Sequence, residues 1–131
     1  MRAALCAGAV GALVGGCGAP AALVEGAQSA GTGFERALRS GDHASACRLL
    51  APETLGQLEQ NGKTTCAQAL GAQELPKAGA VRAIEVYGRQ AMLRLDGDTL
   101  FLSRFSGGWK VVAAGCTPRG EQPYQCALKG G

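Results

Sequence analysis

The N-terminal segment limits how much of this chain is available to fold. Arg2 is the only charged residue before Glu25, and the small, apolar run AALCAGAVGALVGG lies between them. A basic start followed by such a run is typical of a secretory signal. The run has about 14 residues, fewer than the ~20 that a membrane-spanning helix requires. We therefore predict an exported chain whose signal peptide occupies residues 1–16.

The end of this run carries a motif around Cys17. The stretch VGGC at residues 14–17 resembles the bacterial lipobox, with an aliphatic residue, two small residues and a cysteine. The resemblance implies that Cys17 is acylated and becomes the new N-terminus, anchored in the cell membrane on its extracytoplasmic face. The alternative is an ordinary signal peptide cleaved elsewhere, with Cys17 as a spare thiol. Residues 17–32 are rich in Gly, Ala and Ser, which predicts a flexible tether.

The cysteine count supports an exported chain. Cys6 leaves with the signal and Cys17 takes the lipid, so an even number remains to form disulfides. The remaining cysteines are Cys47, Cys66, Cys116 and Cys126. Four cysteines allow three pairings, and we predict Cys47–Cys66 with Cys116–Cys126 because each pair is local. Metal binding is the alternative, but the chain has no Cys-x-x-Cys and a single histidine, so we predict no metal site.

Charge points to no particular partner. The net charge of the chain is +3, and its basic residues are scattered along the sequence. Nucleic-acid-binding domains concentrate Lys and Arg on one face or along one helix. We therefore expect no nucleic-acid partner, and export would also separate the chain from nucleic acid.

The pattern of the first half of the mature chain predicts helices. Phe34, Ala37 and Leu38 share one helical face, and Gly41 follows as a stop signal. Asp42 and Thr65 are suited to cap two later helices. The helices are expected within residues 33–42, 43–50, 52–60 and 65–73. Cys47 and Cys66 then lie on the inward faces of neighbouring helices.

The pattern of the second half predicts strands joined by tight turns. Alternating apolar and polar residues predict strands within residues 81–88, 89–97, 98–105 and 108–115. Gly-rich joins between them indicate hairpins, and consecutive hairpins make an antiparallel meander. The tail, residues 116–131, is expected to form a closed loop and at most one short strand. Helices followed by a curled antiparallel sheet make an α+β fold of one domain, residues 33–131.

Two stretches carry a resemblance to a known fold. They are GFERALRSGDHASACRLLAPETLGQLEQ and DGDTLFLSRFSGGWKVVAAGC. Together they resemble the nuclear transport factor 2-like, or cystatin-like, fold, and more narrowly small actinobacterial lipoproteins of unassigned function. The resemblance covers residues 33–116. It implies a cone-shaped sheet wrapped around the helices, and it says almost nothing about activity.

Aromatic residues are the candidates for a pocket inside such a cone. Phe101 and Phe105 share one face of their strand, and Trp109 is placed to join them across the hairpin. The full set is Phe34, Tyr87, Phe101, Phe105 and Trp109. In the resembling fold these would line a small apolar ligand site. The simpler alternative is that they pack in the core.

A catalytic set is not visible in the sequence. His43 is adjacent to Asp42, so the two side chains do not face each other on a helix. Asp96 and Asp98 flank Gly97 and are better explained as turn residues. We predict a non-enzymatic, lipid-anchored domain without a cofactor that binds an envelope protein or small apolar ligand. The alternative is a small isomerase or hydrolase, which would need His43 or Glu85 buried with a shifted pKa.

Overall fold

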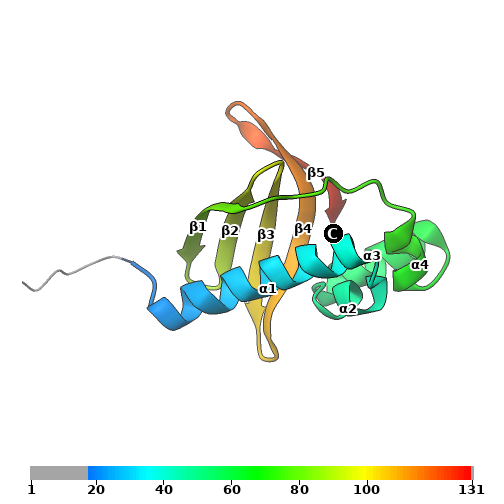
Figure 1. The fold of residues 1–131 in the computed structure, drawn as a ribbon, viewed down its shortest axis with the longest axis horizontal. Helices are drawn as coiled ribbons and strands as arrows, with labels where there is room; N and C mark the ends of the chain where they lie inside the picture. The colour runs from blue at the N-terminus through cyan, green and yellow to red at the C-terminus, as the bar shows by residue number, and fades with distance from the viewer. Residues whose placement is uncertain (1–17, 131) are drawn as a thin grey trace, which may run out of the picture.

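Four helices precede a five-stranded antiparallel sheet in the computed structural model, which describes residues 18–130 (Figure 1). The helices are α1 (Ala21–Ser40), α2 (His43–Arg48), α3 (Pro52–Gly62) and α4 (Cys66–Gly71). The strands are β1 (Val81–Tyr87), β2 (Gln90–Leu95), β3 (Asp98–Phe105), β4 (Gly108–Arg119) and β5 (Gln122–Lys129). The order of helices and then strands confirms the predicted α+β class. The predicted signal peptide and Cys17 lie outside the described residues.

The helix ends follow the predicted chemistry. Gly41 adopts a left-handed conformation with φ 74° and ends α1, as glycine does readily. The side chain of Asp42 accepts a hydrogen bond from the Ser45 N–H at the start of α2. Thr65 caps α4 through the N–H of Gln68. These caps mark the boundaries between the helices, and α2 packs against α4, to which a disulfide joins it.

The first helix begins much earlier than predicted. Residues 17–32 were expected to be a flexible tether, but α1 begins at Ala21. The small residues in this stretch serve close packing instead of flexibility. A side chain at Gly26 would lie 3.0 Å from the Trp109 ring, and one at Gly31 would collide with Leu93. Glycine at these positions lets the helix backbone approach the sheet, and the buried contacts stabilise a segment with weak helix propensity.

The sheet is a simple meander with the strand order β1-β2-β3-β4-β5. Each neighbouring pair is antiparallel, which confirms the hairpins predicted from the turn residues. The tail is closed by Cys116–Cys126 as expected, but its last strand is longer than predicted, because β5 has eight residues paired along β4. The structure therefore has one more complete strand than the turn signals alone indicated.

The core lies between α1 and one face of the sheet. Phe34 from α1 is fully buried against this face, as are Leu93 of β2 and Leu100 and Leu102 of β3. Because strand side chains alternate between faces, Met92, Phe101 and Ser103 belong to the opposite face of the sheet. Figure 1 shows α1 lying across the strands, with α2, α3 and α4 gathered beyond β4 and β5.

Candidate functional site

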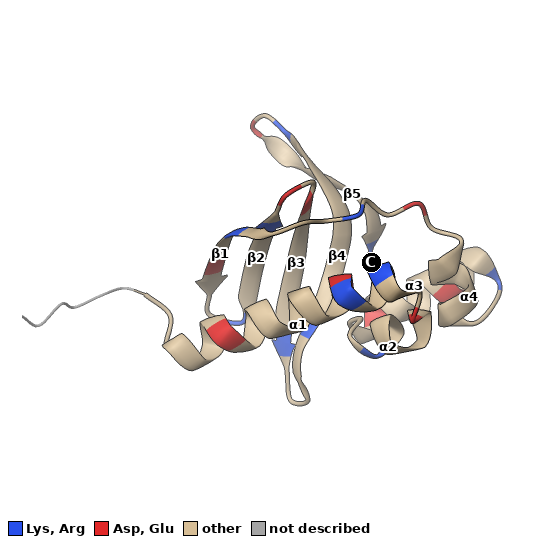
Figure 2. Ribbon diagram, in the orientation of Figure 1, with Lys and Arg blue, Asp and Glu red and all other residues tan. Residues whose placement is uncertain are grey.

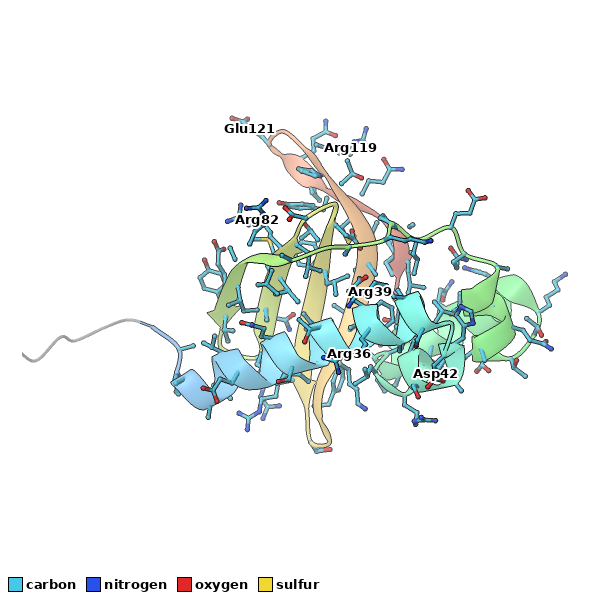
Figure 3. The ribbon with its side chains drawn as sticks, in the orientation of Figure 1. Arg36, Arg39, Asp42, Arg82, Arg119 and Glu121 are labelled. Carbon is cyan, nitrogen blue, oxygen red and sulfur yellow. A yellow bond between two sulfur atoms is a disulfide. The ribbon has the colours of Figure 1, made fainter. Side chains whose placement is uncertain are left out.

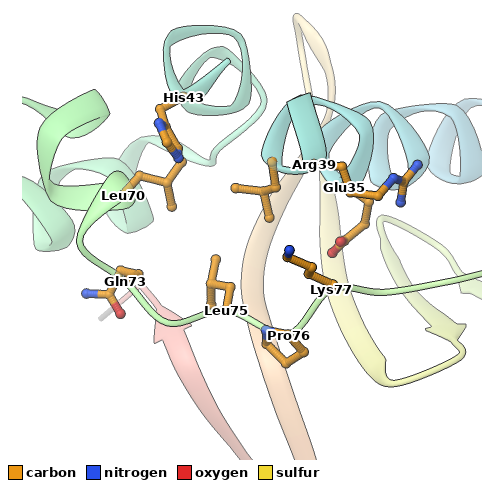
Figure 4. A pocket seen from close by; sticks show the side chains of 9 residues that line it. Glu35, Arg39, His43, Leu70, Gln73, Leu75, Pro76 and Lys77 are labelled. Carbon is orange, nitrogen blue, oxygen red and sulfur yellow. The ribbon is translucent and has the colours of Figure 1, made fainter. Parts of the chain in front are cut away.

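A small cavity lies between the end of α1 and the connection from α4 to β1 (Figure 4). Its volume is about 100 Å³. Glu35 and Arg39 line it from α1, and His43 lines it from α2. The other lining residues are Leu38, Leu70, Gln73, Leu75, Pro76 and Lys77. The cavity therefore combines an apolar wall with one acidic and several basic side chains.

Glu35 is the unusual member of this set. Only 2% of the residue is exposed, and neither carboxylate oxygen has a hydrogen-bond partner within residues 18–130. Burial raises the pKa of Glu35 to about 7, and the nearby negative charge of Asp98 adds to the rise. The positive charge of Arg39 and, to a lesser extent, the nearby backbone N–H of Ala78 oppose this rise only in part. A carboxyl with this pKa can hold or release a proton near neutral pH.

The packing of α1 explains why an acidic side chain is buried here. Ala27, Gly31 and Glu35 follow one another at intervals of four residues, so they lie along one helical face. All three are buried, because Gly31 brings this face against Leu93 and Leu100 of the sheet. Glu35 therefore enters the interior one turn after the closest contact between α1 and the sheet.

Arg39 does not neutralise Glu35 by direct pairing. Its guanidinium donates a hydrogen bond to the carbonyl oxygen of Ala78, at 3.1 Å, and so fastens α1 to the connection before β1. Lys77 is exposed at the same connection. The cavity thus holds a carboxyl without partners beside cationic groups that are either engaged elsewhere or in solvent.

Asp98 is a second buried acid, at the start of β3. Its carboxylate accepts hydrogen bonds from three backbone N–H groups, those of Thr99, Gly115 and Cys116, at 2.7 to 3.0 Å. Burial raises the pKa of Asp98, and the three donors oppose that rise. The ladder between β3 and β4 ends at Phe101 and Ala113, so the bonds from Gly115 and Cys116 join the two strands beyond their last paired residues. Asp98 thus has a structural role in addition to the predicted turn role.

The sequence-predicted catalytic candidates take different positions. His43 is half-buried beside Gly71 and lines the cavity, but it makes no hydrogen bond to Glu35. Glu85 is half-buried on the opposite face of the sheet. Its carboxylate pairs with Arg94, at 3.4 Å, and accepts a hydrogen bond from the Tyr87 hydroxyl. The structure therefore does not bring His43 and Glu85 into one site.

The five aromatic residues predicted to share a pocket do not meet. Phe34 and Trp109 are buried on the helix-covered face, whereas Phe101 lies on the opposite face and packs edge-on against Tyr124, with ring centres 5.2 Å apart. The side chains of Tyr87 and Phe105 are exposed. The five residues do not form one shared pocket, and the alternative of core packing holds for Phe34 and Trp109. Because Arg104 pairs with Trp109, the side chains of Trp109 and Phe105 lie on opposite faces of the sheet.

A second hollow adjoins Phe105. It has a volume of about 420 Å³ and lies between the start of α3 and residues of β3 and β4. Its lining residues are Ala51, Pro52, Glu53, Thr54, Ser103, Phe105, Val112 and Gly130. Thr54 is fully buried and donates a hydrogen bond to the Val112 carbonyl oxygen, which fixes α3 to β4. This hollow is the larger and more apolar of the two described.

Both predicted disulfides are present. Cys47 of α2 is bonded to Cys66 of α4, and Cys116 of β4 is bonded to Cys126 of β5. The first bond joins two short helices, and the second crosses directly opposite positions of one hairpin. The cysteines of the described part of the chain are therefore all paired, as the local spacing predicted.

The sequence analysis missed Glu35. In a helix that begins at residue 33, Glu35 and Arg39 look like an exposed i, i+4 ion pair. The available signal was the series Ala27, Gly31, Glu35, which becomes visible only if the helix is extended back to Ala21. Because the small residues before residue 33 predict a tether, the sequence gives no sign that Glu35 is buried.

Comparison with known protein families, characterised proteins and solved structures gives no match for this chain. Within residues 18–130, no helix is long and apolar enough to cross a membrane. The same residues contain no cluster of three or more His, Cys, Asp or Glu side chains that could hold a metal ion. The function must therefore be argued from the residues of this chain.

Proposed function

We propose that this chain is an exported lipoprotein, anchored through Cys17 on the extracytoplasmic face of the cell membrane. The observation that carries the proposal is the pair of disulfides, Cys47–Cys66 and Cys116–Cys126. Such bonds form and persist in oxidising compartments and are rare in reducing ones. They also account for four of the six cysteines. Cys6 lies in the signal segment, which leaves Cys17 of the VGGC stretch for the lipid.

The segment between Cys17 and α1 is short. Gly18, Ala19 and Pro20 are the only residues between Cys17 and the start of α1. An extended chain spans at most about 3.5 Å per residue, so Ala21 would lie within roughly 14 Å of the acylated residue. The proposed anchor therefore holds the domain close to the membrane surface, without the long tether that the sequence suggested.

The proposed role of the domain is binding or assistance to a partner, without catalysis. The space between α1 and the sheet is filled by Phe34, Leu93, Leu100 and Leu102, all fully buried. A filled interior leaves no open cone for a substrate. Binding would then use the surface, where the hollow beside Phe105 offers an apolar site for a small ligand or for a side chain of an envelope protein.

We further propose that the fold belongs with the cystatin-like, or nuclear transport factor 2-like, α+β domains. Support comes from the meander order of the five strands and from the long helix that lies across one face of the sheet. The short α2, α3 and α4 beyond the sheet agree with the small size of the domain. Function does not follow from this fold, because it supports enzymes and binding modules alike.

A small enzyme is the second candidate, and one observation favours it. Glu35 is a buried carboxyl without partners, it lines a cavity, and its pKa is about 7. General acids and bases are often tuned to this range by burial. The cavity of about 100 Å³ would admit only a small group of a substrate. We rank this candidate second because no nucleophile or second acid–base group is hydrogen-bonded to Glu35 among residues 18–130.

The first experiment is an intact mass measurement, without reductant, on protein from the membrane fraction. The proposal predicts residues 17–131 plus acyl groups, less the four hydrogens lost in forming two disulfides. A matched sample carrying Cys17→Ser should lose the acyl mass and leave the membrane fraction or remain unprocessed. A mass that starts at Met1 with free thiols would overturn the proposal.

A ligand screen separates the binding module from the enzyme. Small molecules are tested for thermal stabilisation of the wild-type chain, of Glu35→Gln and of Phe105→Ser. Ligands that lose their effect only in Phe105→Ser support binding at the apolar hollow. Ligands that lose it only in Glu35→Gln support chemistry at the buried carboxyl and would reverse the ranking of the two candidates.

A further inference from the structure

Two turns lie side by side at one end of the sheet. The first joins β1 to β2 between Tyr87 and Gln90, and the second joins β3 to β4 between Phe105 and Gly108. The N–H of Arg104 donates a hydrogen bond to the carbonyl oxygen of Arg89, at 2.9 Å, and so links the two turns. They therefore form one continuous surface at this end of the molecule.

This end carries exposed aromatic side chains. Tyr87 is 69% exposed and Phe105 is 38% exposed, and these are the large apolar side chains found exposed among residues 18–130. Each stands at the strand end that enters one of the two linked turns. Tyrosine in particular has a polar tip on an apolar ring, which suits the boundary between lipid headgroups and acyl chains. Two exposed aromatic side chains at one end of the sheet indicate a binding surface there.

The same end is basic. Arg89 and Arg104 are exposed, and the ammonium group of Lys110 reaches the carbonyl oxygen of Arg48, an exposed arginine of α2. No acidic residue occurs between Thr99 and Gly120, or between Val86 and Leu95. The nearest acid on β1 is Glu85, which is already paired with Arg94. Glu53 lines the hollow beside Phe105, but the two turns themselves carry no acidic residue, and Figure 2 shows blue without red around the turn between β3 and β4.

The start of α1 lies at this end as well. Gly26 contacts the ring of Trp109, which follows the second turn directly, and α1 also contacts β1. Figure 1 shows the first turns of α1 near the arrowhead of β1, where β1 ends at Tyr87. Glu25 is the one acidic residue in the first half of α1. An anchor at Cys17 would therefore bring the two turns toward the membrane.

We propose that this turn surface, formed by Tyr87, Arg89, Arg104, Phe105 and Lys110, rests on anionic phospholipid headgroups. The proposal takes its orientation from the proposed anchor at Cys17, and its chemistry from the described residues. The arginines face the lipid phosphates and the two aromatic rings enter the interface, while Lys110, whose ammonium group is hydrogen-bonded to Arg48, adds positive charge beside them. Each basic residue near an anionic surface contributes about 1 kcal/mol, roughly a fivefold gain in occupancy. Together with the proposed anchor, these contacts would hold the domain in one orientation.

The opposite end of the sheet serves as an internal control. Figure 3 shows Arg82, Arg119 and Glu121 there, far from the start of α1. Arg82 is paired with Asp96, and Glu121 lies two residues after Arg119. Positive charge at this end is thus balanced by acidic neighbours, and the large exposed apolar side chains of the described chain lie elsewhere. The two ends differ in the properties that a lipid surface would recognise.

The test is amide hydrogen exchange of the full chain on vesicles. Protein purified from membranes is placed on phosphatidylcholine vesicles or on vesicles that also contain phosphatidylglycerol. We expect severalfold slower exchange at residues 86–90 and 104–109 on the anionic vesicles only. About 1 M salt should abolish this protection, because the screening length falls to roughly 3 Å. Arg89→Gln with Arg104→Gln should also abolish it, whereas Arg119→Gln should leave it unchanged.

Several results would overturn the proposal. Equal exchange on both vesicle types, or undiminished protection in the double variant, would show that anionic lipid does not bind the turn surface. Protection at residues 119–122 would show that the other end faces the membrane. The mass of the same sample tests the anchor separately. An acylated protein without protection keeps the anchor and loses the surface, and protection without acyl mass keeps the surface and loses the anchor.

Discussion

Two buried carboxylates in this domain have opposite surroundings. Asp98 accepts three backbone hydrogen bonds at the point where β3 and β4 cease to pair. Glu35 accepts none, although it is the more deeply buried of the two. Burial raises the pKa of both groups, to about 7 for Glu35. The cost of burying a charge is thus offset by three donors at Asp98 and only weakly, by Arg39 and the Ala78 N–H, at Glu35.

The difference separates a carboxylate that holds two strands together from one that no hydrogen bond holds in place. Buried polar groups in native proteins nearly always have partners, because an unpaired one costs stability. Asp98 follows this rule and its removal should damage the sheet. Glu35 departs from it, and such departures concentrate at sites that bind ligands or transfer protons. The predictions below test whether the two groups differ in this way.

The largest effect is expected at Asp98. Asp98→Ala leaves three backbone N–H groups without their acceptor, and each unsatisfied buried donor costs about 1–3 kcal/mol. We expect the free energy of unfolding to fall by at least ~3 kcal/mol, measured by urea denaturation. The matched control is Asp96→Ala, which removes an exposed ion pair with Arg82 and should cost less than about 1 kcal/mol. Similar losses in both variants would remove the structural role of Asp98.

The second effect is the pH dependence caused by Glu35. The unfolded carboxyl loses its proton near pH 4.5, whereas the folded one keeps it to about pH 7. The native state therefore binds more protons in this range, and stability falls as pH rises from about 4.5 to 7, by roughly 3 kcal/mol. In Glu35→Gln this part of the slope should vanish, so the variant gains relative stability at pH 8. Parallel stability curves for the two proteins would contradict a raised pKa.

Gly31 should control how deeply Glu35 is buried. A methyl group at Gly31 meets Leu93 in the core, so Gly31→Ala should push α1 outward. We expect a loss of about 1 kcal/mol in unfolding free energy, because overpacking outweighs the gain in helix propensity. Water would then reach Glu35 and lower its pKa, which flattens the pH slope.

Gly33→Ala is the matched control for that experiment. A side chain at Gly33 would make only an ordinary contact with Leu49, at 3.5 Å. The improved helix propensity should therefore stabilise the protein by about 0.5–1 kcal/mol. Stabilisation by both alanines would show that α1 does not depend on close approach at Gly31.

The smallest effect is the electrostatic coupling between the two carboxyls. The charge of Asp98 is one of the causes that raise the pKa of Glu35, after burial. In Asp98→Asn the pKa of Glu35 should fall, yet remain above its usual value because burial persists. Carbon-13 chemical shifts of the Glu35 carboxyl, followed through a pH titration, measure this change. An unchanged midpoint would mean that the two groups titrate independently.

Much of the fold could be predicted from local patterns. The caps at Asp42 and Thr65, the stop at Gly41 and the hairpin turns appear where the residue types indicated. Each depends on chemistry within a few residues, such as a side-chain oxygen facing an N–H or a glycine with positive φ. The strand of residues 122–129 was underestimated, because its alternation is weak and its order depends on pairing along β4.

The candidate site was much less predictable. The stretch from Ala21 to Thr32 has a tether-like composition, and it becomes helical because Gly26 and Gly31 fit against Trp109 and Leu93. Composition alone does not distinguish a glycine that provides flexibility from one that permits close packing. The aromatic pocket was not predictable for a related reason. Whether two aromatic side chains share a pocket depends on the strand register between β3 and β4.

By itself, the sequence determined the order of helices and strands, the α+β class and the two local disulfides, because these follow from short-range periodicity, capping and spacing. Only the tertiary structure decided that the glycine-rich start of the domain is a helix and that Glu35 is buried without partners. It also decided that Tyr87 and Phe105 remain exposed beside Arg89 and Arg104. These outcomes depend on which distant surfaces approach one another, and that is set by packing across the whole core.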